Sequence, residues 1–297
     1  MSSEFNTLAS MEEVGRRRSG GRAFGRGVLA VASNGILWIF CATYIFPFMW
    51  MIYNTLKTQP QFILNIFSLP IPPVWSNWRD IFSIPDTYSA LINSSYNTAL
   101  SMVFIVFFSF TVGYFLSRYS FPGRNFIYGF FLVGMLVPIY ALLVPVYIQF
   151  NKLGMTNHRY TLLIPYVAFS LPQAIYLFDS YMRTIPRSIE EAAFVDGATT
   201  NQIMTKIMFP ICMPITGTVL VLNFLGLWNE FPFALVLVSG AGYRTVPIWL
   251  TTFQGQYSSQ ITMRITAMVI AMTPIIVAYF FLRDRMMEGL TSGAIKG

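Results

Sequence analysis

Charge is scarce in this chain. Only 10% of its 297 residues are Asp, Glu, Lys or Arg, whereas 55% are hydrophobic and 17% are aromatic. Soluble domains carry about 25% charged residues, so the composition excludes an ordinary soluble domain and indicates a membrane protein. The net charge of +7 would also fit a nucleic-acid or lipid partner. Its distribution along the chain instead indicates membrane topology, and we expect lipid contact and no nucleic acid.

Histidine, cysteine and the familiar catalytic motifs are also missing or nearly so. The single histidine, His158, excludes a histidine-cluster metal site. Cys41 and Cys212 lie within or beside apolar runs, which indicates packing groups rather than a disulfide framework. The chain has no G-x-x-x-x-G-K-[ST], no H-E-x-x-H and no G-x-S-x-G. We therefore expect no metal, no cofactor and no catalytic residue here.

Long uncharged runs are what the chain has in place of charge. A span needs about 20 apolar residues, and in lipid every backbone group must be paired internally, so each run predicts a helix. The fold class is therefore all-α, a polytopic membrane protein with six transmembrane helices. The runs lie between Arg26 and Lys57, Asp86 and Arg118, Arg124 and Lys152, Arg159 and Asp179, Lys206 and Glu230 (continuing to about Val238), and Arg264 and Arg283.

Lys and Arg predict the orientation of these helices. With a cytoplasmic N-terminus, thirteen of the nineteen basic residues fall in inside segments and six outside, so both termini are expected in the cytoplasm. The first run is too long for a signal-peptide core, so it should remain as a helix. Residues 1–26, rich in Ser, Gly and Arg, predict a flexible cytoplasmic extension, and residues 27–297 predict one transmembrane domain. The external segment from Thr55 to Thr87 should hold a short helix around Trp75 to Phe82.

Prolines interrupt two of the predicted spans. Pro138 and Pro145 should kink or break the third span, and Pro165 and Pro172 the fourth. Such breaks are tolerated where neighbours or a water-filled cavity satisfy the freed carbonyls.

A short polar island, Glu190 to Gly197, holds three of the twelve carboxylates between the fourth and fifth spans. Ser188-Ile189-Glu190-Glu191 fits a capping box, and Gly197 is placed to end the helix in a left-handed conformation. A second short helix should run from about Thr200 to Phe209. The apolar residues of this cytoplasmic helix-turn-helix have no lipid to bury in and could fill a partner's groove; they are Ile189, Ala192, Phe194 and Ile203.

The island has a recognisable spacing. Glu191-Ala192-Ala193, three residues, Gly197, nine residues and Ile-x-x-Pro ending at Pro210 resembles the Glu-Ala-Ala (EAA) loop of the membrane subunits of binding-protein-dependent ABC importers. Phe209 stands where that family favours leucine. Four further stretches are similar to the carbohydrate-type branch, specifically the maltose-transporter G-subunit family: residues 118–124 (RYSFPGR), 135–154, 228–231 (WNEF) and 289–297 (GLTSGAIKG).

This resemblance implies a type I ABC importer permease fold in the inner (plasma) membrane of a bacterium or archaeon. It implies as partners a second permease, two ABC ATPase subunits, an extracytoplasmic solute-binding protein and a sugar or oligosaccharide. ATP and Mg²⁺ would be held by the ATPase subunits. It implies that the loop at about 184–210 couples to the ATPases through Glu190, Glu191, Ala192, Ala193, Asp196 and Gly197. It also implies that the cytoplasmic tail, about 283–297, reaches the ATPases with Gly293, Ala294, Ile295 and Lys296. The alternative without a functional role is that the polar island is an ordinary cytoplasmic connector between two spans.

Glu230 is the one acidic group deep inside a predicted span. Asn223, Gly226 and Glu230 at i, i+3 and i+7 would share one helix face and line a translocation path. The alternative is a paired structural carboxylate at the subunit interface, with Asn229 nearby. Asp179, at the cytoplasmic end of the fourth span, is expected to be solvated. The path candidates are Asn223, Gly226, Trp228, Asn229, Glu230, Tyr140 and Gln173.

Several other functions compete with a sugar permease. An amino-acid or peptide permease of the same class shares the island, although residues 228–231 and the tail favour sugar. An ion-coupled secondary transporter would not need the island, and no coupled carboxylate network supports one. A polytopic membrane enzyme lacks its catalytic constellation. The external segment Gly240 to Thr262, with Tyr243, Trp249, Phe253 and Tyr257, either projects toward a binding protein or caps the bundle.

Overall fold

The computed structural model describes residues 33–255 and 259–294, with side chains described up to residue 281. Helices and turns account for this part of the chain, and no strand occurs in it. The all-α prediction is thus confirmed for the described residues. The chain divides into two compact units, Met1–Pro73 and Val74–Gly297. The predicted extension, residues 1–26, lies outside the described residues.

The first unit contains the apolar helix Ser33–Asn54 and the short helix α2, Gln59–Leu64. Within this unit the side chains of residues 33–49 are exposed, so the helix presents hydrophobic surface on all sides, as expected of a segment whose solvent is lipid. Thr58 and Gln61 form a capping box at the start of α2.

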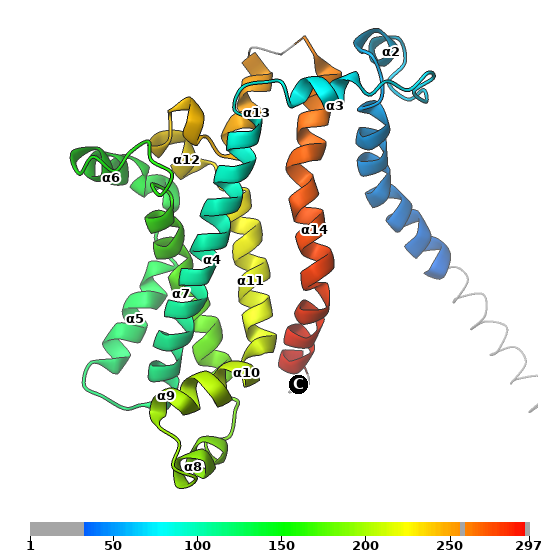
Figure 1. The fold of residues 1–297 in the computed structure, drawn as a ribbon. Coiled ribbons are helices and arrows are strands. Elements are labelled where there is room, and N and C mark those ends of the chain that lie inside the picture. Colours follow the sequence, from blue (N-terminus) through cyan, green and yellow to red (C-terminus); the bar gives the residue numbers. More distant parts are fainter. Residues whose placement is uncertain (1–32, 256–258, 295–297) are drawn as a thin grey trace, which may run out of the picture. The chain divides into compact units, whose positions relative to one another are not determined.

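The second unit is a bundle of long helices with short helices at both ends (Figure 1). Helices α4, α5, α7, α11 and α14 run lengthwise. Helices α8, α9 and α10 lie at one end, and α3, α6, α12 and α13 at the other. The elements are α3 (Ser76–Ile81), α4 (Thr87–Arg118), α5 (Arg124–Gly134), α6 (Ile139–Lys152), α7 (Leu163–Met182), α8 (Ser188–Val195), α9 (Thr200–Gln202), the π-helix η1 (Ile203–Met208), α10 (Phe209–Ile211), α11 (Met213–Trp228), α12 (Pro232–Leu237), the 3₁₀-helix η2 (Ala241–Tyr243), α13 (Val246–Gly255) and α14 (Ile261–Ala294).

The long helices only partly match the six predicted spans. Among the described residues, three helices are long and apolar enough to cross a membrane: Ser33–Asn54, Thr87–Arg118 and Ile261–Phe281. Two bent pairs would raise the number to five, Arg124–Gly134 with Ile139–Lys152 at 100° and Thr200–Ile211 with Met213–Trp228 at 72°. The first bend falls at Pro138, where a break was predicted. By contrast, α7 continues through Pro172.

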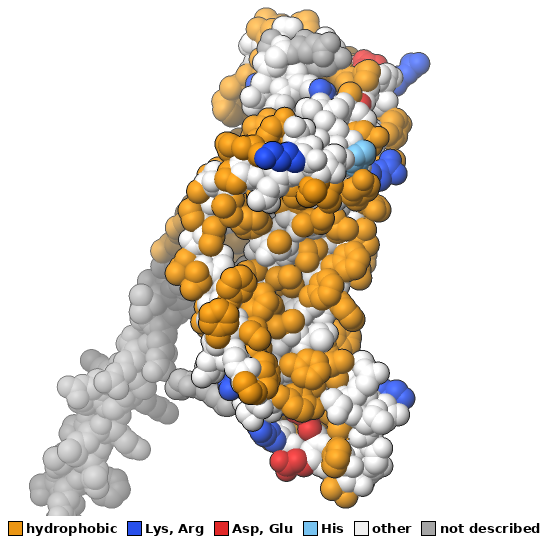
Figure 2. All heavy atoms as spheres, turned by 90° about the vertical axis from the view of Figure 1, so that its left-hand side faces the viewer, with side chains coloured by type: hydrophobic (Ala, Val, Ile, Leu, Met, Phe, Trp, Pro, Cys, Tyr) orange, Lys and Arg blue, Asp and Glu red, His pale blue; other side chains and the backbone are white. Residues whose placement is uncertain are grey.

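One core cluster joins α4, α7 and the start of α11. It includes Tyr114, Phe178, Met182 and Cys212, all at most 1% exposed. Charged side chains gather toward the two ends of the face that carries α5 and α6, and hydrophobic ones cover the stretch between (Figure 2). A second cluster lies toward the end of the bundle opposite α8, where Trp228, Trp249 and Phe253 pack against α14. Trp228 Nε1 donates to the Ala271 carbonyl at 3.1 Å. Trp249 and Phe253 therefore cap the bundle, and Tyr257 lies outside the described residues.

Gly113 allows α4 and α7 to approach closely. A Cβ at this position would lie 2.9 Å from Phe178 Cβ and 3.2 Å from the Asp179 backbone nitrogen. Replacing Gly113 by alanine should therefore destabilise the protein by about 1–3 kcal/mol through overpacking, measured as a lower thermal midpoint in detergent. Gly129→Ala in α5 is the matched control, because nothing lies within 4 Å of its Cβ and alanine favours helix. Equal midpoints for the two variants would contradict this packing.

Candidate functional site

Helix α8, which carries most of the polar island, protrudes from one end of the second unit (Figure 1). Its N-cap is Arg187, which has helical dihedral angles, and no side chain caps it. The backbone N–H groups of Glu190 and Glu191 both bond to the Arg187 carbonyl. The predicted capping box of Ser188 and Glu191 is therefore wrong, because the helix already begins at Ser188 and the hydroxyl sits inside its first turn.

The turn after α8 follows the prediction more closely. Gly197 has φ +86°, the left-handed conformation expected at a helix end. A capping box does form two residues later, where Thr199 and Gln202 exchange hydrogen bonds at the start of α9. The spacing Thr-x-x-Gln could have revealed it. Ile203 is only 5% exposed and belongs to the core cluster, so the expectation that it fills a partner's groove is wrong.

Glu190 turns inward rather than outward. Tyr114 Oη donates to Glu190 Oε2 at 2.9 Å, and Arg118 forms an ion pair with Glu190 Oε1. The side chains of Arg118 and Glu190 are 6% and 14% exposed. Arg118 Nη2 also donates at 3.1 Å to the carbonyl of Ile185, a residue just before α8. This cluster, Tyr114–Arg118–Glu190, ties α8 to the last turn of α4.

The rest of α8 faces outward. Glu191 and Ala192 are exposed, as are Phe194 at 70% and Val195 at 84%. Asp196 and Gly197 are also exposed, whereas Ala193 packs partly against the core cluster. An aromatic side chain and a valine are therefore both exposed at the end of α8. The two glutamates of the island therefore differ: one holds the helix in place and the other stands on its exposed surface.

Asp179 and Arg183 form a second ion pair at this end of the bundle. Arg183 Nε and Nη2 donate to the two Asp179 carboxylate oxygens at 2.9 and 2.8 Å. The Asp179 side chain is 1% exposed, so the expectation that it is solvated is wrong. Its hydrogen bonds to Arg183 raise the pKa of that guanidinium.

The C-terminal part of the predicted site is only partly described. Helix α14 continues to Ala294, so Gly293 and Ala294 end a helix rather than lie in an extended tail. Ile295 and Lys296 lie outside the described residues.

Glu230 lies beyond the end of α11, which stops at Trp228, so it does not continue the face of Asn223 and Gly226. Its carboxylate accepts hydrogen bonds from the backbone N–H groups of Phe233 at 2.6 Å and Ala234 at 3.1 Å. Tyr166 Oη donates to it at 3.1 Å. These contacts hold the carboxyl group of Glu230 at the N-terminus of α12, which supports a structural role for this residue.

The other path candidates are dispersed. Asn223 is buried and donates to the Val219 carbonyl of its own helix, and Trp228 is buried against α14. Asn229 is exposed and donates to the Leu225 carbonyl. Gly226, Tyr140 and Gln173 are exposed on three different helices, α11, α6 and α7. The structure therefore does not gather the seven candidates into one site.

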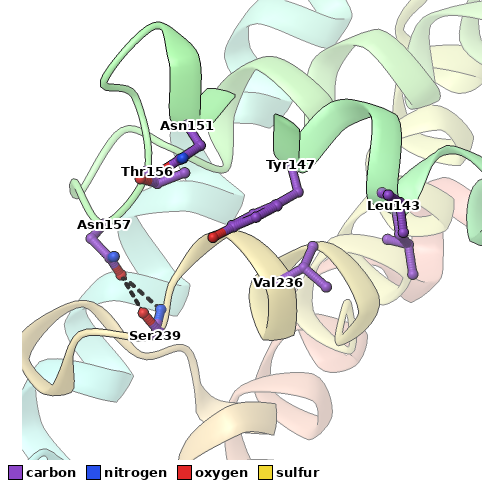
Figure 3. A pocket seen from close by; sticks show the side chains of 8 residues that line it. Leu143, Tyr147, Asn151, Thr156, Asn157, Val236 and Ser239 are labelled. Carbon is purple, nitrogen blue, oxygen red and sulfur yellow. Dashed lines mark hydrogen bonds between the residues drawn. The ribbon is translucent and has the colours of Figure 1, made fainter. Parts of the chain in front are cut away.

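A cavity of about 320 Å³ lies between α6 and α12 (Figure 3). Tyr147 projects into it, and Asn157 lines its rim with Oδ1 accepting from Ser239 N at 2.7 Å and Gly240 N at 2.8 Å. None of the seven path candidates lines it. Its walls are Leu143, Val144, Tyr147, Asn151, Thr156, Asn157, Val236 and Ser239.

Within residues 33–255 and 259–294, no group of three or more His, Cys, Asp or Glu side chains could hold a metal ion. Glu190 and Asp179 are paired with arginines. Glu230 accepts hydrogen bonds from Tyr166 and from backbone N–H groups.

Residues 105–292 match the family model of the binding-protein-dependent transport system inner membrane component. The chain belongs to this family. It is 33% identical over 257 residues to the trehalose transport system permease protein SugB of Mycobacterium tuberculosis, covering 85% of this chain and 93% of that protein. It is 29% identical over 254 residues to the sulfoquinovosyl glycerol transport system permease protein SmoH of Agrobacterium fabrum, covering 85% and 89%.

A solved structure shows the fold. A chain of a bacterial ABC transporter involved in the import of the acidic polysaccharide alginate superimposes with a TM-score of 0.75 at 21% identity, covering 87% of this chain and 96% of that chain. The type I ABC importer permease fold expected from the island and its flanking stretches is thus confirmed. The chain is a membrane permease subunit.

Proposed function

We propose that this chain is the permease subunit of an ATP-driven, binding-protein-dependent importer of a sugar or oligosaccharide. Relatives that align over most of both chains are named for the transport of trehalose and of sulfoquinovosyl glycerol, and both of these solutes contain a sugar. A second permease would complete the pathway, an extracytoplasmic receptor would deliver the solute, and two ATPase subunits would bind and hydrolyse ATP. No cofactor is assigned to this chain itself.

We propose that the exposed surface of α8 contacts the ATPase subunits and couples ATP hydrolysis to transport. Phe194 and Val195 project from the end of the bundle, Glu191 stands beside them, and the Tyr114–Arg118–Glu190 cluster fixes the helix that bears them to α4. A short helix with an apolar tip can enter a groove on an ATPase, and a rigid joint can pass the movement of that groove to the transmembrane helices. Gly293 to Lys296 would add contacts from the C-terminus.

The membrane topology follows the same proposal. Counting each bent pair once gives five spans, and the 20-residue helix α7 makes the sixth. The positive-inside bias supports a cytoplasmic location for α8 and for both termini. Residues 1–26 would be an extension and residues 27–297 the permease domain. Of the path candidates, Gly226, Asn229, Tyr140 and Gln173 stay available on exposed surfaces for the cavity shared with the second permease.

Reconstitution tests this function. We expect sugar uptake into proteoliposomes that contain this chain, its partner permease and the ATPases, provided that receptor is outside and ATP inside. A panel of mono- and oligosaccharides tested by thermal shift of the receptor would choose the radiolabelled sugar. Omitting ATP should abolish uptake, and an imposed proton or sodium gradient should not replace it. Uptake by this chain alone, driven by an ion gradient, would contradict the proposal.

A further inference from the structure

The loop that follows the first helix carries a cluster of exposed hydrophobic side chains. Leu64 is 85% exposed and Ile71 is 78% exposed, higher than most residues of the apolar helix before them. We call residues 63–71, which comprise the end of α2 and the irregular chain after it, the apolar loop. Its exposed hydrophobic members are Ile63, Leu64, Ile66, Phe67, Leu69 and Ile71.

Side chains from the end of the helix bind the carbonyl groups of this loop. Trp50 Nε1 donates to the Ile66 carbonyl at 3.1 Å, and Lys57 Nζ donates to the carbonyls of Asn65 and Ile66 at 3.1 and 3.2 Å. Tyr53 Oη reaches the Phe67 carbonyl at 3.5 Å. The loop is therefore folded back onto the helix that precedes it.

The loop also satisfies its own polar groups. Asn65 Oδ1 accepts from the backbone N–H groups of Phe67 at 2.9 Å and Ser68 at 3.1 Å, and Ser68 Oγ donates to the Asn65 carbonyl at 3.0 Å. Gln61 Nε2 donates to the Ile71 carbonyl at 3.2 Å. Irregular backbone that turns polar groups inward and apolar side chains outward suits a surrounding that offers few hydrogen bonds.

The fold-back sets the depth of the loop. Trp50 lies four residues before the end of the helix at Asn54, so its turn is about 6 Å inside that end. The carbonyl that it binds lies beside this turn. Trp and Tyr side chains favour the boundary between acyl chains and headgroups, and Trp50 and Tyr53 both lie near the end of the helix.

Charge is missing from the same segment. The 21 residues from Thr58 to Trp78 contain no Asp, Glu, Lys or Arg. The flanking Lys57 is buried, with its ammonium group on the loop carbonyls, and burial lowers its pKa. A surface that receives a soluble receptor would be expected to have charged side chains in a polar rim around its apolar centre. Residues 58–78 contain no charged side chain.

We propose that the apolar loop inserts into the lipid interface at the outer end of the first helix, so that its partner is the bilayer itself. Burying six hydrophobic side chains there would anchor a helix that its own unit leaves uncovered and would set its depth and tilt. The proposal rests on Ser33–Asn54 spanning the membrane and not on the identity of the transported solute.

Site-directed spin labelling of the complete transporter in phospholipid nanodiscs tests this placement. Leu64→Cys and Ile71→Cys would each carry a nitroxide in a Cys41→Ala background; Cys212 is fully buried and stays. Asp80→Cys, at an exposed acidic position of α3, is the water-facing control. Relaxation by oxygen, which concentrates in lipid, is compared with relaxation by water-soluble nickel-EDDA.

We expect the ratio of oxygen to nickel accessibility to be severalfold higher at Leu64 and Ile71 than at Asp80, and to stay unchanged when solute-binding protein is added. A ratio equal to that at Asp80 would show a loop in water and overturn the proposal. Low accessibility to both reagents, or protection that appears only with the receptor, would show a protein partner and overturn it as well. Uptake measured on the same samples separates these outcomes from failure of the transport function.

Discussion

Replacing Glu190 by alanine should loosen α8, the helix proposed to contact the ATPases, and so uncouple transport from ATP hydrolysis. The substitution leaves the Arg118 guanidinium buried at 6% exposure without its ion-pair partner, and Tyr114 Oη without its acceptor. Breaking one side of a buried pair costs about 3–5 kcal/mol. Because α8 is short and otherwise mostly exposed, we expect this loss to appear as local opening of residues 184–210, measured by hydrogen exchange, with a matching loss of uptake.

Three variants separate the ion pair from a general effect of substitution. Tyr114→Phe removes a single hydrogen bond and should cost about 1 kcal/mol. Arg118→Met combined with Glu190→Leu replaces both charges by apolar groups and should recover much of the protection, as in other buried pairs. Glu191→Ala is the matched control in the same helix, since that side chain is exposed. If Glu191→Ala opens the loop as far as Glu190→Ala does, the structural role of Glu190 is refuted.

Replacing Phe194 by serine should prevent the ATPases from associating while leaving the permease folded. The side chain is 70% exposed, so its removal costs the isolated subunit little. At an interface, truncating a central aromatic side chain costs about 2 kcal/mol or more, which corresponds to roughly thirtyfold in affinity. Affinity purification in mild detergent would measure ATPase recovery, and proteoliposomes would measure uptake, which should fall to a similar extent.

The control for Phe194 is another exposed aromatic residue of the same unit. Tyr140 in α6 is 74% exposed at the opposite end of the bundle (Figure 1). Tyr140→Ser should leave ATPase recovery unchanged, whatever its effect on the translocation path. Full recovery of ATPase with Phe194→Ser would remove the main support for docking through α8.

Local features of this fold could be predicted because they depend on neighbouring residues. The break at Pro138, the short helix Trp75 to Phe82, which appears as Ser76–Ile81, and the left-handed Gly197 all follow from short-range backbone chemistry. The spacing of Glu191, Ala192, Ala193 and Gly197 was sufficient to indicate the family.

The contacts that decide the role of each carboxylate could not be predicted in this way. Glu190 meets Tyr114 across 76 residues of sequence, and Glu230 meets Tyr166 across 64. Adjacent glutamates on one helix point about 100° apart, so a small rotation of α8 decides which one faces the bundle. Sequence reasoning grouped Glu190 with Glu191 because nothing local distinguishes them. It read Glu230 as part of a helix face because the end of α11 depends on how α12 packs.

The most direct test of the account is the accessibility of α8 with and without the ATPases. Val195→Cys, at an 84% exposed position, in a Cys41→Ala background offers one reactive thiol on α8, since Cys212 is buried. We expect a maleimide to label it rapidly in the permease pair alone and many times more slowly in the complete transporter, with protection lost when the ATPases are stripped away. Equal labelling rates in both preparations would contradict the claim that α8 is the contact between the ATPase subunits and the permease.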